Sequence, residues 1–246
     1  MITKRIDRIH RSTALAGLGF LLAVTATLAA AETEEGFVSM FNGTDLTGWQ
    51  GAPGWWEVQD GAIVAESSAE KPSDRTHYLY WTGGEPADFE MRCRYRITGK
   101  GGNSGIQFRS ETRPNWDTWG YQADFDTNHD YTGFLYQHGR GLVAGRGQQV
   151  VIDKAGEKTV TTFADSAKLL EAVHDDDWNE YRILAKGRHI TLWINGQRMC
   201  QVEDHEPKYS LPKGIIAVQM HAGPPMRVEF KDLRIRQFPT HAKDHP

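Results

Sequence analysis

Polar side chains that could bind a ligand alternate with apolar ones in the segment GGNSGIQFRS, residues 101–110. The alternation predicts a β-strand with Ile106 and Phe108 on the core side and with Gln107 and Arg109 on the opposite side. Amide and guanidinium groups offer several hydrogen-bond donors in fixed directions. The strand is therefore a candidate wall of a binding site, with Asn103 at its entrance.

Three further segments repeat this pattern, with apolar residues on one side and hydrogen-bonding residues on the other. They are GYQADFD (120–126), TGFLYQHGR (132–140) and IIAVQMHA (215–222), and their polar sides carry Gln122, Asp124, Asp126, Tyr136, His138, Arg140, Gln219 and His221. For any one strand, a solvated outer face is the more common explanation. Several strands together predict a concave polar groove of the size of a sugar. Trp116, Trp119 and Trp193 could stack on sugar rings, although tryptophan more often packs in a core.

Other chemistry has weaker support in the sequence. No serine lies in a G-x-S-x-G turn, and the C-x-x-C spacing of zinc sites is absent. Asp126, Asn128 and Asp130 alternate as calcium ligands do, but Tyr131 stands where a calcium loop needs glycine. A divalent cation such as calcium, bound in another geometry, remains an alternative.

The elements that would position these residues are short strands separated by glycine-rich turns. Asp60-Gly61 and Asn195-Gly196 predict two-residue hairpin turns. Strict alternation predicts a strand over residues 88–97, and a shift of the apolar phase near Lys231-Asp232 predicts a β-bulge. Residues 166–173 alone have helical spacing. We therefore expect an all-β sandwich of antiparallel sheets, with one short helix at most, forming a single domain over residues 36–238.

The amino terminus indicates export. Residues 1–11 are basic, residues 14–30 are mostly apolar, and three alanines end at residue 31. These features are typical of a signal peptide over residues 1–31, with a membrane anchor as the less favoured alternative. We expect a periplasmic or secreted protein that has no membrane contact after the signal is removed.

The net charge and the two cysteines limit the classes of binding partner and the disulfides that the chain can form. The formal net charge of −4 makes nucleic acid an unfavourable partner. Cys93 and Cys200 are the two cysteines, and export would permit a disulfide between them. The alternation around Cys93 instead favours a buried thiol.

Six segments in order along the chain resemble the 3-keto-disaccharide hydrolase family: FNGTDLTGW (41–49), GGNSGIQFR (101–109), TGFLY (132–136), DWNEYRI (177–183), INGQ (194–197) and VQMHAGPPMRVEFKDLRIR (218–236). The resemblance implies a concanavalin-like jelly roll of two curved sheets that binds its ligand on the concave one. It also implies action on glycosides that carry a ketone at sugar carbon 3. Where many members have Glu-x-Gln before an Asp, this chain has Gln122-Ala123-Asp124-Phe125-Asp126, so a family carboxylate is displaced.

This implied chemistry needs a base for the proton on carbon 2 and donors for the enolate oxygen. We assign Asp124 as the base, with Glu and His as open alternatives, and Arg109 and His221 as donors. The residues expected to orient the carbohydrate are Asn103, Gln107, Gln122, Tyr136, Arg140 and Gln219. The alternative is a lectin-like carbohydrate-binding module without catalysis, because one fold serves both functions.

Overall fold

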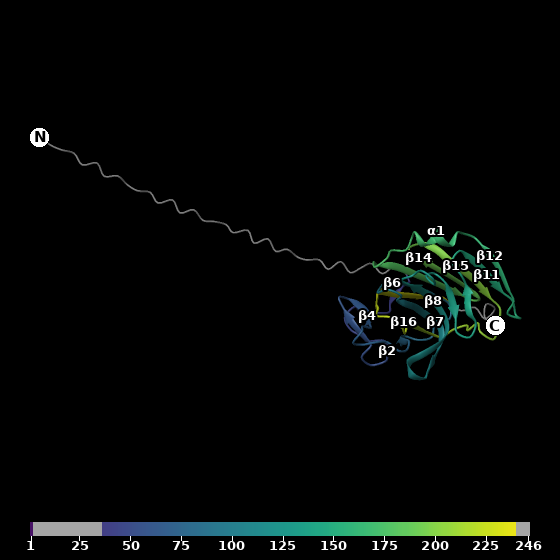
Figure 1. Ribbon diagram of the computed structural model, residues 1–246, viewed down its shortest axis with the longest axis horizontal. Helices are drawn as coiled ribbons and strands as arrows, with labels where there is room; N and C mark the ends of the chain where they lie inside the picture. The colour runs from purple at the N-terminus through teal and green to yellow at the C-terminus, as the bar shows by residue number, and fades with distance from the viewer. Residues whose placement is uncertain (2–35, 240–246) are drawn as a thin grey trace. The chain divides into compact units, whose positions relative to one another are not determined.

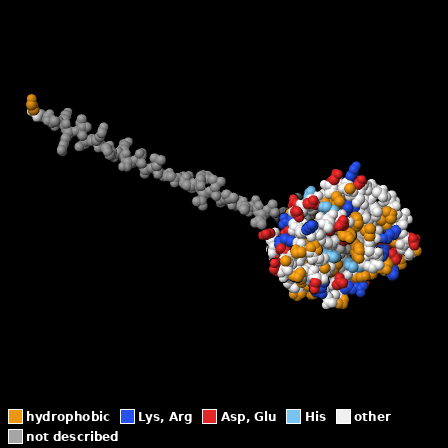
Figure 2. Space-filling view, in the orientation of Figure 1, with side chains coloured by type: hydrophobic (Ala, Val, Ile, Leu, Met, Phe, Trp, Pro, Cys, Tyr) orange, Lys and Arg blue, Asp and Glu red, His pale blue; other side chains and the backbone are white. Residues whose placement is uncertain are grey.

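The computed structural model describes Met1 and residues 36–239, and residues 36–239 fall within one compact unit. In that unit two β-sheets pack face to face (Figure 1). The expected signal peptide, residues 1–31, lies outside the described residues apart from Met1. No helix of the described part of the chain is long and apolar enough to cross a membrane. Charged and apolar side chains are interspersed over the surface in view (Figure 2).

The larger sheet has ten strands. Along the sheet they follow the order β12 (Lys158–Thr162), β11 (Gln148–Ile152), β15 (Gln197–Asp204), β14 (His189–Ile194), β13 (Asn179–Lys186), β6 (Phe89–Thr98), β17 (Arg227–Gln237), β4 (Ala62–Glu66) and β3 (Trp56–Gln59), and β1 (Val38–Ser39) also pairs with β17. All pairs are antiparallel except β11 with β15, which run parallel. The helix α1 (Ser166–Leu170) begins at Asp165, whose carboxylate caps two backbone N–H groups.

The smaller sheet has seven strands and carries the polar segments described above. Its order is β10 (Gly141–Ala144), β9 (Leu135–Gln137), β8 (Asp117–Asp126), β7 (Asn103–Arg113), β16 (Ile215–Met220), β5 (His77–Trp81) and β2 (Trp49–Gly51), with the 3₁₀ turn η1 (Pro114–Trp116) between β7 and β8. Between the two sheets lies a core of fully buried aliphatic and aromatic side chains, among them Phe108, Phe125, Tyr181 and Phe230. One face of β7, β8 and β16 contributes to this core, which leaves the opposite face for polar groups.

The sequence-based expectations for the fold class and for the turns are confirmed. The structure is all-β with one short α-helix, and both hairpin turns form with positive φ at Asp60, Gly61, Asn195 and Gly196. The register of β17 shifts between Lys231 and Arg234, as the change of apolar phase predicts. Cys93 and Cys200 are both buried free thiols, so the disulfide is not formed.

The turn of the β14–β15 hairpin provides a test of backbone strain. Gly196 has φ 79°, and nothing lies within 4 Å of the position that a Cβ would occupy. We expect Gly196→Val to lower the free energy of unfolding by about 1–3 kcal/mol, because a β-branched residue is strained at positive φ. Chemical denaturation measures the change, and Gln197→Val, one residue later in the strand, is the control. Equal stability of the wild type and Gly196→Val would contradict this account of the turn.

Candidate functional site

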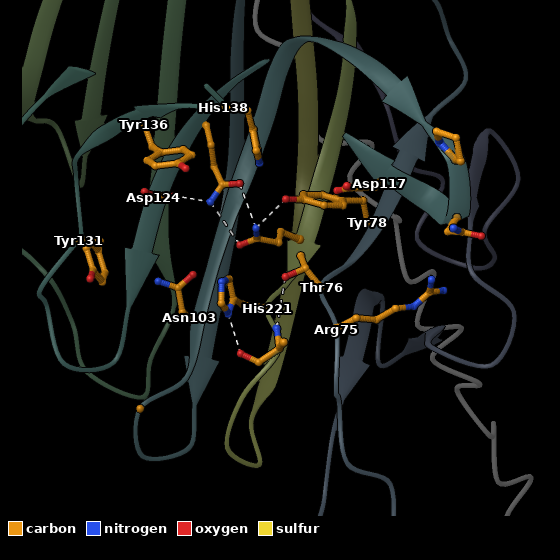
Figure 3. Close-up of a pocket in the computed structure, with 16 residues that line it drawn as sticks. Arg75, Thr76, Tyr78, Asn103, Asp117, Asp124, Tyr131, Tyr136, His138 and His221 are labelled. Carbon is orange, nitrogen blue, oxygen red and sulfur yellow. Dashed lines mark hydrogen bonds between the residues drawn. The ribbon is translucent and has the colours of Figure 1, made fainter. Parts of the chain in front are cut away.

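A polar cavity of about 860 Å³ lies on the face of the smaller sheet that points away from the core (Figure 3). Six residues expected at the site line it: Asn103, Gln122, Asp124, Tyr136, Gln219 and His221. They come from four different strands or strand ends that the sheet brings side by side. The cavity has the volume of a small-molecule site and exceeds the needs of one sugar ring.

A chain of hydrogen-bonded amides forms the floor of this cavity. Gln107 donates to Gln122 Oε1, and Gln122 Nε2 donates to Asp124 Oδ1. Gln219 Nε2 donates to Gln122 Oε1 at 3.0 Å and to the Tyr78 hydroxyl at 2.9 Å. Because each amide is held by its neighbours, the floor is rigid before a ligand arrives. Gln107 is fully buried, so it supports the floor from below and does not line the cavity.

Gly105 makes room for this network. It lies opposite Asp124 in the β7–β8 ladder, and a Cβ at this position would come within 2.7 Å of Gln122 Cγ. Real Cβ atoms do not approach other atoms so closely, so any larger residue must displace the Gln122 side chain. This steric requirement explains one glycine of the 101–110 segment that strand periodicity leaves unexplained.

We expect Gly105→Ala to lower turnover of the 3-keto-glycoside that the resemblance implies as substrate by about 10–100-fold. A small displacement of Gln122 would misplace both Asp124 and Gln219. The free energy of unfolding should fall by about 1–3 kcal/mol from overpacking. Steady-state kinetics and thermal melting measure the two effects. Gly102→Ala is the matched control, since its methyl would meet Met226 at 3.1 Å, away from the network. Turnover unchanged in Gly105→Ala would show that the position of Gln122 is unimportant.

Asp117 and Asp124 are the carboxyl groups that line the cavity, and the buried one of the two is Asp124. It is 6% exposed, and burial raises its pKa to about 8, although the hydrogen bond from Gln122 acts in the opposite direction. The negative charge of neighbouring Asp126 raises the pKa further. A buried carboxyl with such a pKa in a polar cavity is typical of a group that transfers protons near neutral pH.

His138 lines the cavity beside Tyr136, and the two rings meet edge to face at 5.4 Å. Its Nδ1 lies 3.2 Å from the Gly120 carbonyl oxygen. A carbonyl only accepts hydrogen bonds, so Nδ1 carries the proton, and Nε2 of the neutral ring is a proton acceptor. Burial lowers the pKa of His138, which favours this neutral form. The sequence placed His138 on a polar strand face without assigning it to the site.

Tyr78 is a site residue that sequence reasoning missed. Its hydroxyl accepts a hydrogen bond from Gln219, so its own proton is available for a ligand. Burial raises its pKa to about 12, and it therefore remains a protonated donor at neutral pH. The segment HYLYW (77–81) consists of Leu79 and four ring-bearing residues, a pattern that is typical of core packing and gave no sign of a polar role.

Three expected site residues do not line the cavity: Gln107, which lies beneath its floor, Arg109 and Arg140. Arg109 has φ 43°, and the β7–β8 register shifts so that Arg109 and Ser110 together oppose Gly120. This bulge turns Arg109 toward the interior, where it donates to the carbonyls of Ala87 and Gly187 and pairs with Asp88 at 3.1 Å. The predicted position of Arg109 in the groove is therefore wrong.

Arg140 is also outside the cavity. The chain reverses at Gly139, which has φ 90°, and the register of alternating side chains ends there. Arg140 then reaches Asp204 and the Tyr121 hydroxyl, and it pairs with Glu206 at 3.2 Å. This buried ion network is structural, and the predicted sugar contact of Arg140 is wrong in position.

The loop expected as a calcium alternative is organised by Asp126. Its carboxylate accepts the backbone N–H groups of Asp130 and Tyr131, both at 2.9 Å, and the Thr132 hydroxyl at 3.0 Å. Both carboxylate oxygens are thus used within the loop. Among residues 36–239, no three His, Cys, Asp or Glu side chains converge as ligands for a metal ion.

The three tryptophans considered for stacking on sugars pack against other side chains. Trp116 packs beside Tyr80 at 5.7 Å, Trp119 packs on Tyr209 at 5.9 Å, and Trp193 lies under Arg182. None of them is among the residues that line the cavity.

Residues 36–236 match the model of the 3-keto-alpha-glucoside-1,2-lyase-like domain. The chain belongs to this family. The match covers both sheets except for the last residue of β17, and it confirms the resemblance found in the sequence motifs. A search of curated proteins gives no match.

Solved structures similar to this lyase-like domain confirm the fold. A candidate glycosyl hydrolase from Parabacteroides distasonis is 18% identical with a TM-score of 0.55, covering 83% of this chain and 95% of its own. A protein of unknown function with a galectin-like fold from Bacillus subtilis is 13% identical (TM-score 0.53; 80% and 92% covered). The carbohydrate-binding module CBM66 from the same organism is 14% identical (TM-score 0.51; 78% and 97% covered). At these identities the likeness establishes the fold alone.

Proposed function

We propose that this protein cleaves 3-keto-glucosides by eliminating the group on sugar carbon 1. The observation that carries the proposal is the buried Asp124, whose pKa of about 8 suits proton transfer, at the floor of a preorganised polar cavity. Membership of a lyase-like family supports the same reaction class. The ordinary pair of glycosidase carboxylates at a fixed separation is not required for this chemistry.

In the first step the ionised Asp124 removes the proton from carbon 2, and the electron pair moves onto the ketone oxygen as an enolate. The Tyr78 hydroxyl is the proposed donor to that oxygen, replacing Arg109 in this role. The Asn103 amide and Gln219 Oε1 hold other sugar oxygens. Gln122, whose amide is already engaged by Gln107, Asp124 and Gln219, positions the Asp124 carboxyl. The enolate is the species that the site stabilises more strongly than the bound ketone.

In the second step the enolate collapses to a double bond between carbons 1 and 2, and the bond from carbon 1 to the leaving oxygen breaks. The protonated Asp124 returns its proton to that oxygen, so the charges balance. Water can then add to carbon 1, with Nε2 of His138 accepting a proton from the water as its oxygen bonds to carbon 1. The enolate that forms takes this proton back from the imidazolium at carbon 2, so that His138 returns to its neutral form. Release of the unsaturated sugar before this addition makes the protein a lyase, and completion of the addition makes it a hydrolase.

His221 contributes at the rim of the cavity. Its Nδ1 lies 2.6 Å from the Ala222 carbonyl, so the neutral ring presents Nε2 as an acceptor. His221 Nε2 is therefore suited to accepting a hydrogen bond from a sugar hydroxyl. To donate a hydrogen bond to an enolate oxygen, as predicted from the sequence, this nitrogen would have to be protonated and the ring charged.

The deciding experiment compares a 3-keto-glucoside with its unoxidised parent, using purified protein and following release of the aglycone. We expect release from the ketone alone. Binding of both sugars without release from either would contradict the enzyme and leave a carbohydrate-binding module. Proton exchange at carbon 2 in deuterated water would separately report the first step.

Export through a signal peptide over residues 1–31 is a further part of the proposal, supported by the basic and apolar pattern of the sequence. We expect protein recovered from the periplasm or the medium to begin near residue 32. Amino-terminal sequencing after cell fractionation measures this. An intact terminus on protein in the membrane fraction would identify an anchor instead.

A further inference from the structure

The outer face of the larger sheet carries an excess of positive charge. The adjacent strands β13, β6 and β17 contain two, three and four Lys and Arg residues, respectively. These nine basic residues stand against four Asp and Glu residues on the same strands. The whole chain has the opposite balance, with a net charge of −4. A local excess of this sign in an acidic protein creates a positive potential that attracts anions.

The carboxylates on this face are shared among several cations. Glu90 alone contacts Arg92 at 2.7 Å, Arg182 at 2.8 Å and Arg236 at 3.0 Å. One carboxylate therefore orients three guanidinium groups. Paired and oriented in this way, the cations lose little side-chain freedom on binding a ligand.

Two guanidinium groups near this cluster have no such partner. Neither Arg94 nor Arg188 has a carboxylate or a side-chain hydrogen bond among residues 36–239. Arg94 lies 5.9 Å above the Trp178 ring, which Lys231 also covers at 3.9 Å. Contact with the ring restricts these cations, and Arg94 is exposed to solvent.

An open groove of about 580 Å³ continues the positive face at one end. Lys186, Arg188, His189 and His205 line it, together with Glu203. Arg182, Leu184 and Lys186 follow one another at every second residue on the outer side of β13. Because Lys186 also lines the groove, the groove and the arginines form one surface. We call this surface the basic face and define it as Arg94, Arg182, Lys186, Arg188 and Lys231.

We propose that the basic face is a second binding site, separate from the cavity on the smaller sheet, for an acidic polysaccharide. A run of cations that extends from a groove across neighbouring strands matches a chain with repeated carboxylates or sulfates. Lys231 lies over the Trp178 ring and Arg182 over the Trp193 ring, which disfavours the stacking of bases on these rings. None of the exposed large apolar side chains lies on β6, β13 or β17, which disfavours insertion into a membrane.

Titration of the full protein with polygalacturonate tests this proposal, and titration with neutral dextran is the comparison. We expect binding to polygalacturonate alone, weakening at least about tenfold as salt rises from ~50 to ~300 mM, because salt screens exposed charges. The double variant Arg94→Glu/Arg188→Glu should bind about tenfold more weakly. Lys154→Glu/Lys168→Glu, the same charge change at exposed positions outside the basic face, should bind like the wild type.

Turnover of a small substrate in the cavity reports folding, and it should be equal in the wild type and in both double variants. Three results would overturn the proposal: no binding of polygalacturonate by the wild type, equal binding by Arg94→Glu/Arg188→Glu, or stronger binding of duplex DNA or of vesicles containing phosphatidylglycerol. If the small substrate is not cleaved at all, the proposed enzymatic function fails, while the binding measurements still decide the basic face.

Discussion

Replacement of Asp124 by asparagine should abolish turnover and stabilise the fold at the same time. The carboxamide is nearly the same size and can still accept the hydrogen bond from Gln122, but it cannot take a proton from carbon 2. We expect turnover to fall by at least about 100–10,000-fold, the usual contribution of a positioned general base. For the wild type, turnover should rise with pH and level off above the pKa of about 8.

The stabilisation follows from the raised pKa. Asp124 has a pKa of about 8 in the folded protein against an ordinary value of 3.8, so folded protein retains a proton that unfolded protein releases. The stability that Asp124 contributes is present below pH 4 and is lost as the pH rises toward 8. Asp124→Asn removes this loss, and it should raise the free energy of unfolding by roughly 2–4 kcal/mol at pH 8 and by little at pH 4.

Thermal melts of both proteins across this pH range measure the effect. Asp130→Asn is the control, because Asp130 is exposed in a loop and its replacement makes the same change of charge. Parallel pH curves for the wild type and Asp124→Asn would show that Asp124 ionises normally. Wild-type turnover in Asp124→Asn would remove it as the base.

Loss of Arg109 should be the most damaging single change to stability outside the aromatic core. Its guanidinium is 3% exposed and joins the Ala87 and Gly187 carbonyls to the Asp88 carboxylate. These contacts tie the start of β6 to the β13–β14 turn. Arg109→Ala removes three hydrogen bonds of a buried charged group, so we expect a loss of about 3–5 kcal/mol in the free energy of unfolding.

Denaturant titration measures this loss, and Arg113→Ala is the matched control. Arg113 lies on the same strand and pairs with Glu111 at 3.1 Å, but both side chains are about half exposed. An exposed pair contributes at most about 1 kcal/mol. Arg109→Lys should recover only part of the loss, because a single ammonium cannot reach all three acceptors in the plane of a guanidinium. A stable, fully folded Arg109→Ala with reduced turnover would instead return Arg109 to the catalytic site.

Local patterns in the sequence determined the strands, the hairpins and most of the site. Alternation separates the core side from the polar side within one strand, and for Gln122, Asp124 and Gln219 this is enough to place them on the correct face. Asn-Gly and Asp-Gly turns require only their own two residues to adopt positive φ. The family resemblance carried by the motifs added the reaction class, which strand periodicity cannot supply.

Tertiary structure decided where local alternation fails and which groups are buried. Arg109 changes sides because the extra residue of a bulge faces Gly120, eleven positions later in the chain, and Arg140 does so because the chain turns at Gly139. Tyr78 becomes a site residue because β5 lies beside β16, so that Gln219 can reach its hydroxyl. The raised pKa of Asp124 is decided in the same way, since desolvation depends on every segment packed around the carboxyl and not on the residues next to it in sequence.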